Sequence, residues 1–204
     1  MEKIEAIIFD LGGVILDIDY NLTRVAFEKL GVAHFEEMYS QATADTLFRR
    51  LETGVITEDA FYSELNTCTG LNLSAEEIKN AWNAMLLSFR EKSLQFLDKI
   101  QPDYKLYLLS NTNFIHIDAF KKMYYLKERR KPFEEYFNKV FYSCEIGFRK
   151  PDSICYQCVL DDLSIKAGST LFIDDSVQNI EGAKNAGMQT VHLLPGKNIE
   201  DLGL

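Results

Sequence analysis

The sequence predicts an α/β fold, in which a mostly parallel sheet carries helices on both faces and a small helical domain is inserted after the first strand. Three observations support this prediction. Short apolar runs typical of buried strands alternate with helical segments in the second half of the chain. Several of these runs end directly in polar residues, as strands do at the ligand-binding edge of an open α/β sheet. Between the first strand and the second, residues 21–90 have helical periodicity.

The first predicted strand delivers an aspartate to a turn. An apolar run, residues 4–9, is followed by Asp10, and Gly12 and Gly13 come shortly after it. A buried strand holds such a carboxylate stiffly at the edge of the sheet where ligands bind. The glycines let the backbone come close to whatever Asp10 meets. Asp10 is therefore the candidate nucleophile.

Residues 17–90 are predicted to form the helical domain, which would lie above Asp10 at the carboxyl edge of the sheet. Apolar residues recur there at helical spacing: Val25, Phe27, Leu30, Leu47, Phe48 and Leu51. Thr57 predicts the start of one helix, and a capping box that begins at Ser74 predicts the start of another. The latter helix is expected to contain Trp82, Met85 and Leu86. No segment of this block predicts a strand.

The sheet domain is predicted to comprise residues 1–16 and 91–204. Its later strands are expected at 105–109, 139–142, 170–173 and 190–194. Its helices are expected at 93–100, in part of 114–130, after Pro151 and at 176–186. We expect Pro151 to occupy the first turn of its helix, where no backbone N–H is needed. Strands that alternate with helices in this way form parallel sheets.

Polar side chains at the ends of the predicted strands form a candidate site. Asp10, Ser110 and the pair Asp174 and Asp175 each follow a strand, and Lys150 lies in the loop after another. In a parallel sheet these strand ends meet at one edge. A carboxylate can attack phosphorus, while a lysine and a hydroxyl hold the phosphoryl oxygens. The further carboxylates offer the hard oxygen ligands that Mg²⁺ prefers, and this ion would offset the charge repulsion.

Each of these residues also has a simpler interpretation. Asp10 could be a turn residue or a helix cap. Ser110 is typical of loops, and Lys150 alone would be a solvated surface lysine. Asp174 and Asp175 could cap the next helix. The order of the four motifs, each at a strand end, favours the catalytic interpretation.

The four motifs resemble those of the haloacid dehalogenase-like (HAD) superfamily. They are Phe9-Asp10-Leu11-Gly12-Gly13-Val14, Leu109-Ser110-Asn111-Thr112, Arg149-Lys150-Pro151, and Phe172-Ile173-Asp174-Asp175-Ser176 with Asn179. The resemblance covers nearly the whole chain, and the helical insertion is similar to the cap of the superfamily's first cap class. The sequence looks most like the branch with bacterial glucose-1-phosphate phosphatase and the phosphatase domain of soluble epoxide hydrolase.

The resemblance implies a Rossmann-like core and a Mg²⁺-dependent phosphatase that acts on a small phosphorylated metabolite, such as a sugar phosphate, through an aspartyl phosphate. It implies that Asp10 is the nucleophile and that Lys150 neutralises charge on the nucleophile and the phosphate. The implied phosphoryl contacts are Ser110, Asn111 and Lys150. The implied metal ligands are Asp10, the carbonyl of Gly12, Asp174 and Asp175. The cap would select the leaving group and exclude water.

One position departs from the family pattern. Phosphatases of the superfamily usually carry a second aspartate two residues after the nucleophile, as general acid and base, and here that residue is Gly12. Loss of a general acid costs roughly 10²–10⁴ in rate if nothing replaces it. Asp17, Asp19, a water or a side chain of the cap could take this role. Cap residues that could select the leaving group are Phe48, Arg49, Phe61 and Trp82, although they also suit the core of a helical bundle.

Two alternatives stay open at this point. Haloacid dehalogenases also lack the second aspartate and need no metal, but Asp174 and Asp175 without a cation would hinder attack by a third carboxylate. The other alternative is a HAD-like binding or regulatory protein with weak activity, which the glycine at position 12 keeps open.

Composition limits the partners and the location. A formal net charge of −9 argues against a general nucleic-acid binder. No apolar run approaches the roughly 18 residues of a membrane span, and a strand that starts within four residues leaves no room for a signal peptide. We therefore expect a cytoplasmic protein with reduced cysteines. Cys155 and Cys158 have CxxC spacing, but without a second Cys or His pair they are interpreted as one face of a helix.

Overall fold

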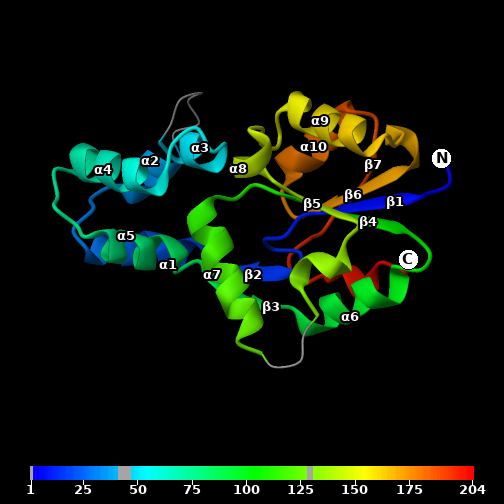
Figure 1. Cartoon of the computed structure of the whole chain (residues 1–204), viewed down its shortest axis with the longest axis horizontal. Coiled ribbons are helices and arrows are strands. Elements are labelled where there is room, and N and C mark those ends of the chain that lie inside the picture. The colour runs from blue at the N-terminus through cyan, green and yellow to red at the C-terminus, as the bar shows by residue number, and fades with distance from the viewer. Residues whose placement is uncertain (1, 41–46, 128–130) are drawn as a thin grey trace.

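A five-stranded parallel sheet forms the centre of the structure. The computed structural model describes residues 2–40, 47–127 and 131–204 (Figure 1). In spatial order the strands are β5 (Lys139–Tyr142), β4 (Lys105–Ser110), β1 (Ala6–Phe9), β6 (Thr170–Asp174) and β7 (Gln189–His192). Every neighbouring pair is parallel. The four strands expected after the first are therefore all present, and the predicted fold class is confirmed.

The register of the sheet brings the predicted site residues to one level. Phe9 is paired with Leu108 on one side and with Ile173 on the other. Asp10 directly follows β1 and Asp174 is the last residue of β6, so they lie side by side at the carboxyl edge. All four residues of β1 are buried, which makes the support of Asp10 rigid.

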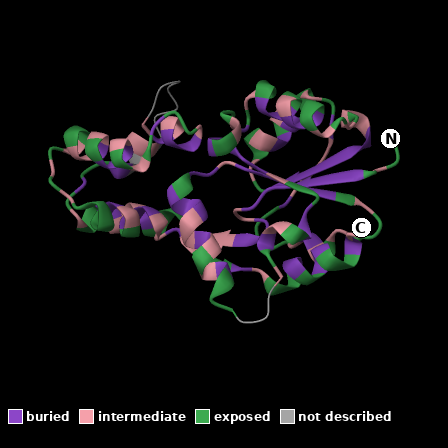
Figure 2. Cartoon of the chain, in the orientation of Figure 1, coloured by how far each residue is buried: buried purple, intermediate pink, exposed green. Residues whose placement is uncertain are grey.

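Helices cover both faces of the sheet, and alternate residues of the strands point to opposite faces. One face packs against α6 (Glu91–Ile100), α7 (Phe114–Tyr125) and the short 3₁₀ helices at Phe133–Tyr136 and Ile199–Asp201. The other face packs against α9 (Ser153–Leu163) and α10 (Val177–Asn185). The short helix α8 (Ser143–Ile146) follows β5 directly, and a 3₁₀ turn at Ala167–Ser169 precedes β6. Figure 2 shows the strands as the most completely buried part of the chain.

Five of the six described helices between β1 and β4 pack around a core of their own. They are α1 (Tyr20–Lys29), α2 (Phe35–Ser40), α3 (Leu47–Glu52), α4 (Glu58–Thr69) and α5 (Ala75–Asn83). Phe27, Leu65 and Trp82 are among the fully buried residues of this core. Thr57 caps α4, and Ser74 forms the predicted capping box with Glu77 at the start of α5.

A small antiparallel sheet corrects the expectation that this block contains no strand. β2 (Leu16–Ile18) pairs with β3 (Leu86–Phe89), where the chain enters and leaves the group of five helices. Leu86 therefore lies in a strand and not in the predicted helix, because α5 ends at Asn83. The pairing partners are about 70 residues apart in sequence, so the local pattern around Leu86 could not reveal them.

The predicted place of Pro151 is also wrong. Asp152 is the N-cap of α9, so Pro151 precedes the helix and does not occupy its first turn.

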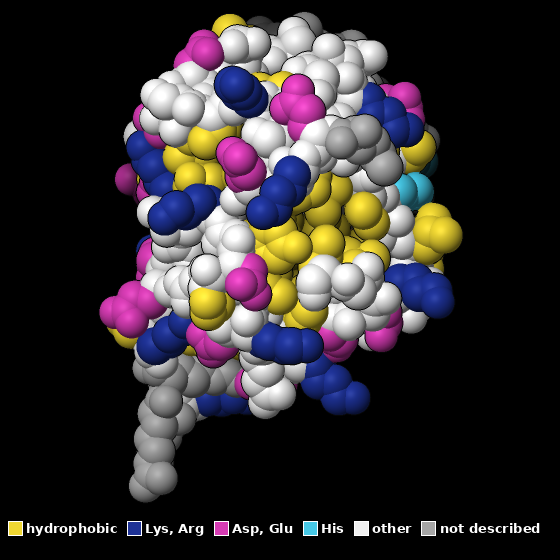
Figure 3. All heavy atoms as spheres, turned by 90° about the vertical axis from the view of Figure 1, so that its right-hand side faces the viewer, with side chains coloured by type: hydrophobic (Ala, Val, Ile, Leu, Met, Phe, Trp, Pro, Cys, Tyr) yellow, Lys and Arg dark blue, Asp and Glu magenta, His cyan; other side chains and the backbone are white. Residues whose placement is uncertain are grey.

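At the far end of the sheet, where the strands begin, apolar side chains gather between charged ones on the surface (Figure 3). Among the described residues, no helix is both long enough and apolar enough to cross a membrane.

Candidate active site

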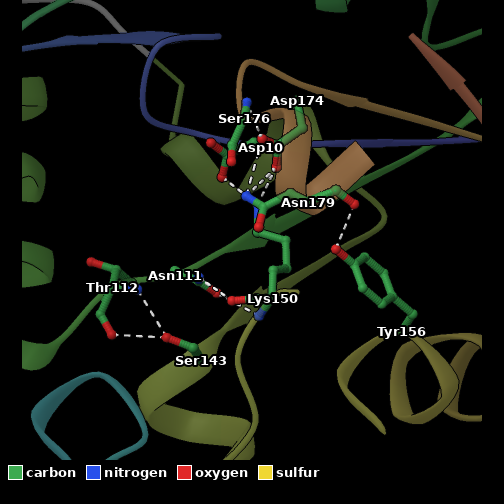
Figure 4. Close-up of polar contacts among 9 residues, drawn as sticks. All are labelled: Asp10, Asn111, Thr112, Ser143, Lys150, Tyr156, Asp174, Ser176 and Asn179. Carbon is green, nitrogen blue, oxygen red and sulfur yellow. Dashed lines mark hydrogen bonds and ion pairs between the residues drawn. The ribbon is translucent and has the colours of Figure 1, made fainter. Parts of the chain in front are cut away.

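Three carboxylates and one lysine meet at the carboxyl edge of β1 and β6. Ligand oxygens of Asp10, Asp174 and Asp175 lie within 4.8 Å of one another. The Nζ of Lys150 donates to Asp10 Oδ1 and to Asp174 Oδ2, each at 2.7 Å (Figure 4). Asp174 is fully buried, and Lys150 is only 1% exposed. The structure therefore brings together the residues from three of the four predicted motifs around one buried ammonium group.

The electrostatics of this cluster call for a further cation. Burial raises the pKa of Asp10, Lys150 lowers it, and the charges of Asp174 and Asp175 raise it again. Burial and the charge of Asp174 also raise the pKa of Asp175. Three carboxylates and one ammonium group leave two negative charges, which a divalent cation would neutralise. Three hard oxygen donors this close together fit Mg²⁺.

Asp174 is held by the start of α10. Its Oδ1 accepts from the backbone N–H of Ser176 at 2.8 Å, and the side-chain amide of Asn179 donates to both carboxylate oxygens at 3.1 and 3.0 Å. The hydroxyl of Tyr156 donates to the carbonyl of Asn179 at 2.7 Å. Asn179 thus positions Asp174, a role that was not predicted although Asn179 belongs to the fourth motif.

The loop after β4 positions the lysine. Asn111 Nδ2 donates to the carbonyl of Lys150 at 2.8 Å, and Asn111 Oδ1 accepts from the N–H of Lys150 at 2.9 Å. The next residue, Thr112, is bonded through its N–H and its carbonyl to the hydroxyl of Ser143. The amide of Asn111 therefore holds the lysine loop. The phosphoryl contacts implied for Asn111 and for the buried Ser110 stay predictions.

The glycines after Asp10 allow a close approach, as expected. Gly13 has a φ of +70°, and a Cβ there would lie 2.1 Å from Asp175 Oδ2, so only glycine fits without displacing that carboxylate. Gly12 lines the cavity above the cluster. A Cβ at Gly12 would lie 2.9 Å from Cδ1 of Ile18. Coordination of a metal by the carbonyl of Gly12 stays a prediction.

A cavity lies between the sheet edge and the group of five helices. Its floor is formed by the strand-end residues, including Asp10, Ser110 and Lys150. The helices, β3 and the residue before it contribute a second part of the lining, the cap-side wall, which consists of Tyr20, Tyr39, Glu52, Met85 and Leu86. These wall residues are mostly polar or half-exposed, and none of them was predicted to line the site. The one local feature that could have drawn attention to Glu52 is its charge at the end of a helix, just before the turn at Gly54.

The residues expected to select the leaving group lie elsewhere. Phe48, Phe61 and Trp82 are buried in the core of the five helices and do not line the cavity. Arg49 pairs with Asp152 at 2.5 Å, also outside the cavity. Large aromatic residues pack inward in a small helical domain, so the alternative interpretation of these residues as core is the correct one for the three aromatics.

The two aspartates considered as replacements for the missing general acid are also outside the cavity. Asp17 Oδ1 accepts from Nε of Arg90 at 2.6 Å. Asp19 is the N-cap of α1 and accepts from the N–H of Asn21 at 2.9 Å. Neither lines the cavity. Asp19 therefore caps a helix and does not face the site.

Comparisons with known proteins agree with this geometry. The chain is 32% identical to the D-ribitol-5-phosphate phosphatase of Bacteroides thetaiotaomicron over 188 residues, which cover 92% of this chain and 90% of the relative. A variant of a HAD family enzyme from that bacterium, crystallised with magnesium and inorganic phosphate, is similar with a TM-score of 0.91 and 31% identity, covering 98% of this chain and 99% of the other. A HAD-like family hydrolase from Porphyromonas gingivalis gives a TM-score of 0.89 and 31% identity, covering 99% and 97%.

The family assignment rests on a match that includes every strand-end motif. Residues 4–187 match the haloacid dehalogenase-like hydrolases, and this range contains Asp10, Ser110, Lys150 and the Asp174–Asp175 pair. The chain therefore belongs to the haloacid dehalogenase-like hydrolase family.

Proposed function

We propose that this protein is a Mg²⁺-dependent phosphatase that hydrolyses the phosphate ester of a small metabolite, with a sugar or sugar-alcohol phosphate as the substrate class. The observation that carries the proposal is the position of Lys150, which is bonded to both Asp10 and Asp174 at 2.7 Å within the carboxylate cluster. The similarity to a D-ribitol-5-phosphate phosphatase supports the substrate class.

The chain's own residues account for the first chemical step. Asp10 attacks phosphorus through a carboxylate oxygen while the bond from phosphorus to the ester oxygen breaks, which gives an aspartyl phosphate and an alkoxide that takes up a proton to leave as the alcohol. Lys150 fixes the orientation of that carboxylate and provides positive charge next to the phosphoryl oxygens. Ser110, at the buried end of β4, donates a hydrogen bond to the phosphoryl group. Water then hydrolyses the aspartyl phosphate and restores Asp10.

Magnesium fits the donor set of the cluster. We propose that Asp10, Asp174, Asp175 and the carbonyl of Gly12 hold the ion. When bound, the ion supplies positive charge that offsets the repulsion between the phosphate and the carboxylates. We also propose that residues 17–90 act as a cap over the core formed by 1–16 and 91–204. The proposed setting is the cytoplasm, where the free cysteines would stay reduced.

The test is phosphate release from an aryl phosphate ester by the full chain in Mg²⁺, followed by a panel of sugar and sugar-alcohol phosphates. Asp10→Asn should abolish turnover, and chelation of the metal should do the same reversibly. Asp103→Asn, at an exposed turn before β4, should leave turnover unchanged. Undiminished turnover by Asp10→Asn would remove Asp10 from the mechanism. Binding of beryllofluoride with Mg²⁺, without turnover of any ester, would instead indicate a binding protein.

The charge of the cluster argues against the dehalogenase alternative. Without a cation, two extra carboxylates beside Asp10 hinder its attack on an anionic haloacid. Halide release from a 2-haloacid in the presence of a chelator would contradict this conclusion.

A further inference from the structure

The proposed phosphatase needs a proton donor for an alkoxide leaving group, and Gly12 has no side chain to supply it. The described residues that line the cavity and carry a weakly acidic or basic group, apart from the lysine and the arginine, are Asp10, Tyr20, Tyr39, Glu52, His116 and Asp175. Asp10 and Asp175 belong to the carboxylate cluster. The donor must therefore be sought among the other four or in bound water.

Both ring nitrogens of His116 are hydrogen-bonded within the protein, and the ring is neutral. Its Nε2 lies 3.1 Å from the carbonyl of Trp82 and must donate to it, so Nδ1 accepts from the side-chain amide of Asn113 at 3.2 Å. Burial lowers the pKa of His116 to about 4. Its single ring proton is therefore held by a backbone carbonyl, and the ring is a poor source of a proton for the substrate.

The tyrosines are weak acids in this setting. Burial raises the pKa of Tyr39, and the nearby charge of Glu52 raises it further. Tyr20 is 55% exposed as a residue, and loss of water around its phenol together with the neighbouring Tyr39, Glu52 and Asp10 raises its pKa. A general acid works best when its pKa is near the working pH, so neither phenol suits the role.

Glu52 is a buried acid that lines the cavity. It is the last residue of α3 and only 8% exposed. Its Oε2 makes no hydrogen bond but pairs with Nε of Arg149 at 3.2 Å. A buried carboxyl oxygen that has an ion pair but no hydrogen bond calls for an explanation, such as a catalytic role. Arg149 precedes Lys150 in the chain, so one loop contacts both Glu52 and the proposed nucleophile.

The direction of attack places the leaving group in the cavity that Glu52 lines. In phosphoryl transfer the attacking and leaving oxygens lie roughly in line on opposite sides of phosphorus. Asp10, at the end of β1, and Glu52, at the end of α3, line the same cavity. The leaving oxygen therefore points away from Asp10 into this cavity, where Glu52 is a lining acid.

We propose that Glu52 protonates the leaving oxygen and so replaces the aspartate that is absent at position 12. The proposal rests on the phosphatase function proposed above. As the bond from Asp10 to phosphorus forms and the bond from phosphorus to the leaving oxygen breaks, the proton of the Glu52 carboxyl moves to that oxygen. The carboxylate then takes a proton from the water that attacks the aspartyl phosphate, and the acid is restored.

The surroundings of Glu52 suit both steps. Burial raises its pKa, whereas Arg149 and Arg49 lower it. Burial thus favours the protonated form before the transfer, and the arginines stabilise the carboxylate after it. The titratable and charged groups that face Glu52 are Arg49, Arg149, Tyr20, Tyr39 and Cys144.

The experiment compares alkyl phosphates, whose leaving groups are strongly basic, with aryl phosphates, whose leaving groups are weakly basic. Neither series carries additional hydroxyl groups. Glu52→Gln keeps the shape of the side chain and removes the proton. In the full chain with Mg²⁺, this variant should lose about 10²–10⁴ in kcat/KM on alkyl phosphates. On aryl phosphates, whose leaving groups need no acid, it should stay within a few fold of the parent. Glu76→Gln, at an exposed position in the first turn of α5, should resemble the parent on both series.

The outcomes separate this proposal from its alternatives. Equal losses on the alkyl and aryl series would mean that Glu52 positions the substrate or the cap, and undiminished turnover of alkyl phosphates would assign the proton to water. Either result overturns the proposal. If the parent chain hydrolyses no ester at all, the phosphatase function itself fails.

A measurement on the parent chain covers the case in which Glu52→Gln does not fold. Turnover of alkyl phosphates should fall at high pH relative to turnover of aryl phosphates, since only the former need the protonated carboxyl. A constant ratio of the two rates across the pH range would contradict the proposal.

Discussion

Asn111 holds the peptide groups on both sides of the Lys150 Cα: its Nδ2 donates to the carbonyl of Lys150 at 2.8 Å and its Oδ1 accepts from the N–H of Lys150 at 2.9 Å. The two residues come from loops after different strands. A side chain that satisfies both polar groups of one residue fixes the backbone of that residue, and here it fixes the backbone from which the buried ammonium group of Lys150 extends.

Asn111→Ala should therefore affect catalysis as well as stability. Two hydrogen bonds of about 0.5–1.5 kcal/mol each are lost, so the free energy of unfolding should fall by about 1–3 kcal/mol. The ammonium group of Lys150 should also lose its fixed position, and kcat should fall more than KM rises. Denaturant unfolding and steady-state kinetics measure the two effects. A loss of stability with unchanged kcat would show that Asn111 only ties the loops together.

Lys150→Met should leave the carboxylate cluster without its internal cation. Breaking a buried ion pair by removal of one partner typically costs 3–5 kcal/mol, so the melting temperature without metal should fall strongly and phosphatase activity should be lost. Added Mg²⁺ should raise the melting temperature of this variant more than that of the parent, because the ion then neutralises more unbalanced charge. Lys184→Met removes an exposed lysine of α10 and should behave like the parent. Equal Mg²⁺ stabilisation of Lys150→Met and parent would argue against a metal at this cluster.

Gly13→Ala should weaken metal binding specifically. The substitution combines the strain of a positive φ with a Cβ placed 2.1 Å from Asp175 Oδ2. Gly70→Ala is the matched control, since Gly70 has the same φ of +70° but nothing within 4 Å of the added carbon. Both variants should lose about 1–3 kcal/mol of stability from backbone strain. The Mg²⁺ concentration for half-maximal activity should rise only for Gly13→Ala, and a similar rise for Gly70→Ala would refute the explanation.

His116 should make the stability of the fold depend on pH. Burial lowers the pKa of His116 from 6.5 to about 4. Between pH 4 and pH 6.5 the imidazole is therefore protonated in the unfolded chain but not in the folded chain. The stability it contributes is complete above pH 6.5 and is lost as the pH falls toward 4, by roughly 3 kcal/mol in total. We expect the free energy of unfolding of His116→Gln to fall less between pH 7 and pH 4 than that of the parent. Parallel curves for the two proteins would mean that His116 titrates normally.

The sequence predicted the sheet domain well because each of its signals is local. Asp10, Ser110 and Asp174 stand directly after apolar runs, and parallel strands necessarily bring such ends together. Ser74 likewise predicted the start of α5 from the residues that follow it. Each of these features depends on neighbours within a few positions along the chain.

The wall of the cavity could not be predicted in the same way. Whether Glu52 or Arg49 of α3 lines the cavity depends on how the helix is rotated against the sheet domain. That rotation is set by contacts distant in sequence, such as the pairing of β2 with β3. Size and charge drew attention to Phe48 and Trp82, which fill the core instead. The side chain of Asn111 was assigned to the phosphate by analogy, whereas its contacts in the fold are with Lys150.

The strand register described above has a consequence for how this site tolerates mutation. Asp10 and Asp174 are neighbours because Phe9 faces Ile173 across β1 and β6. A slip of one residue between these strands would bring Asp175 to that level and turn its side chain to the opposite face. The apolar residues of the two strands therefore set the spacing of the charged groups. Substitutions such as Ile173→Ala, although they touch none of the charged groups, should shift Asp10 and Asp174 relative to each other.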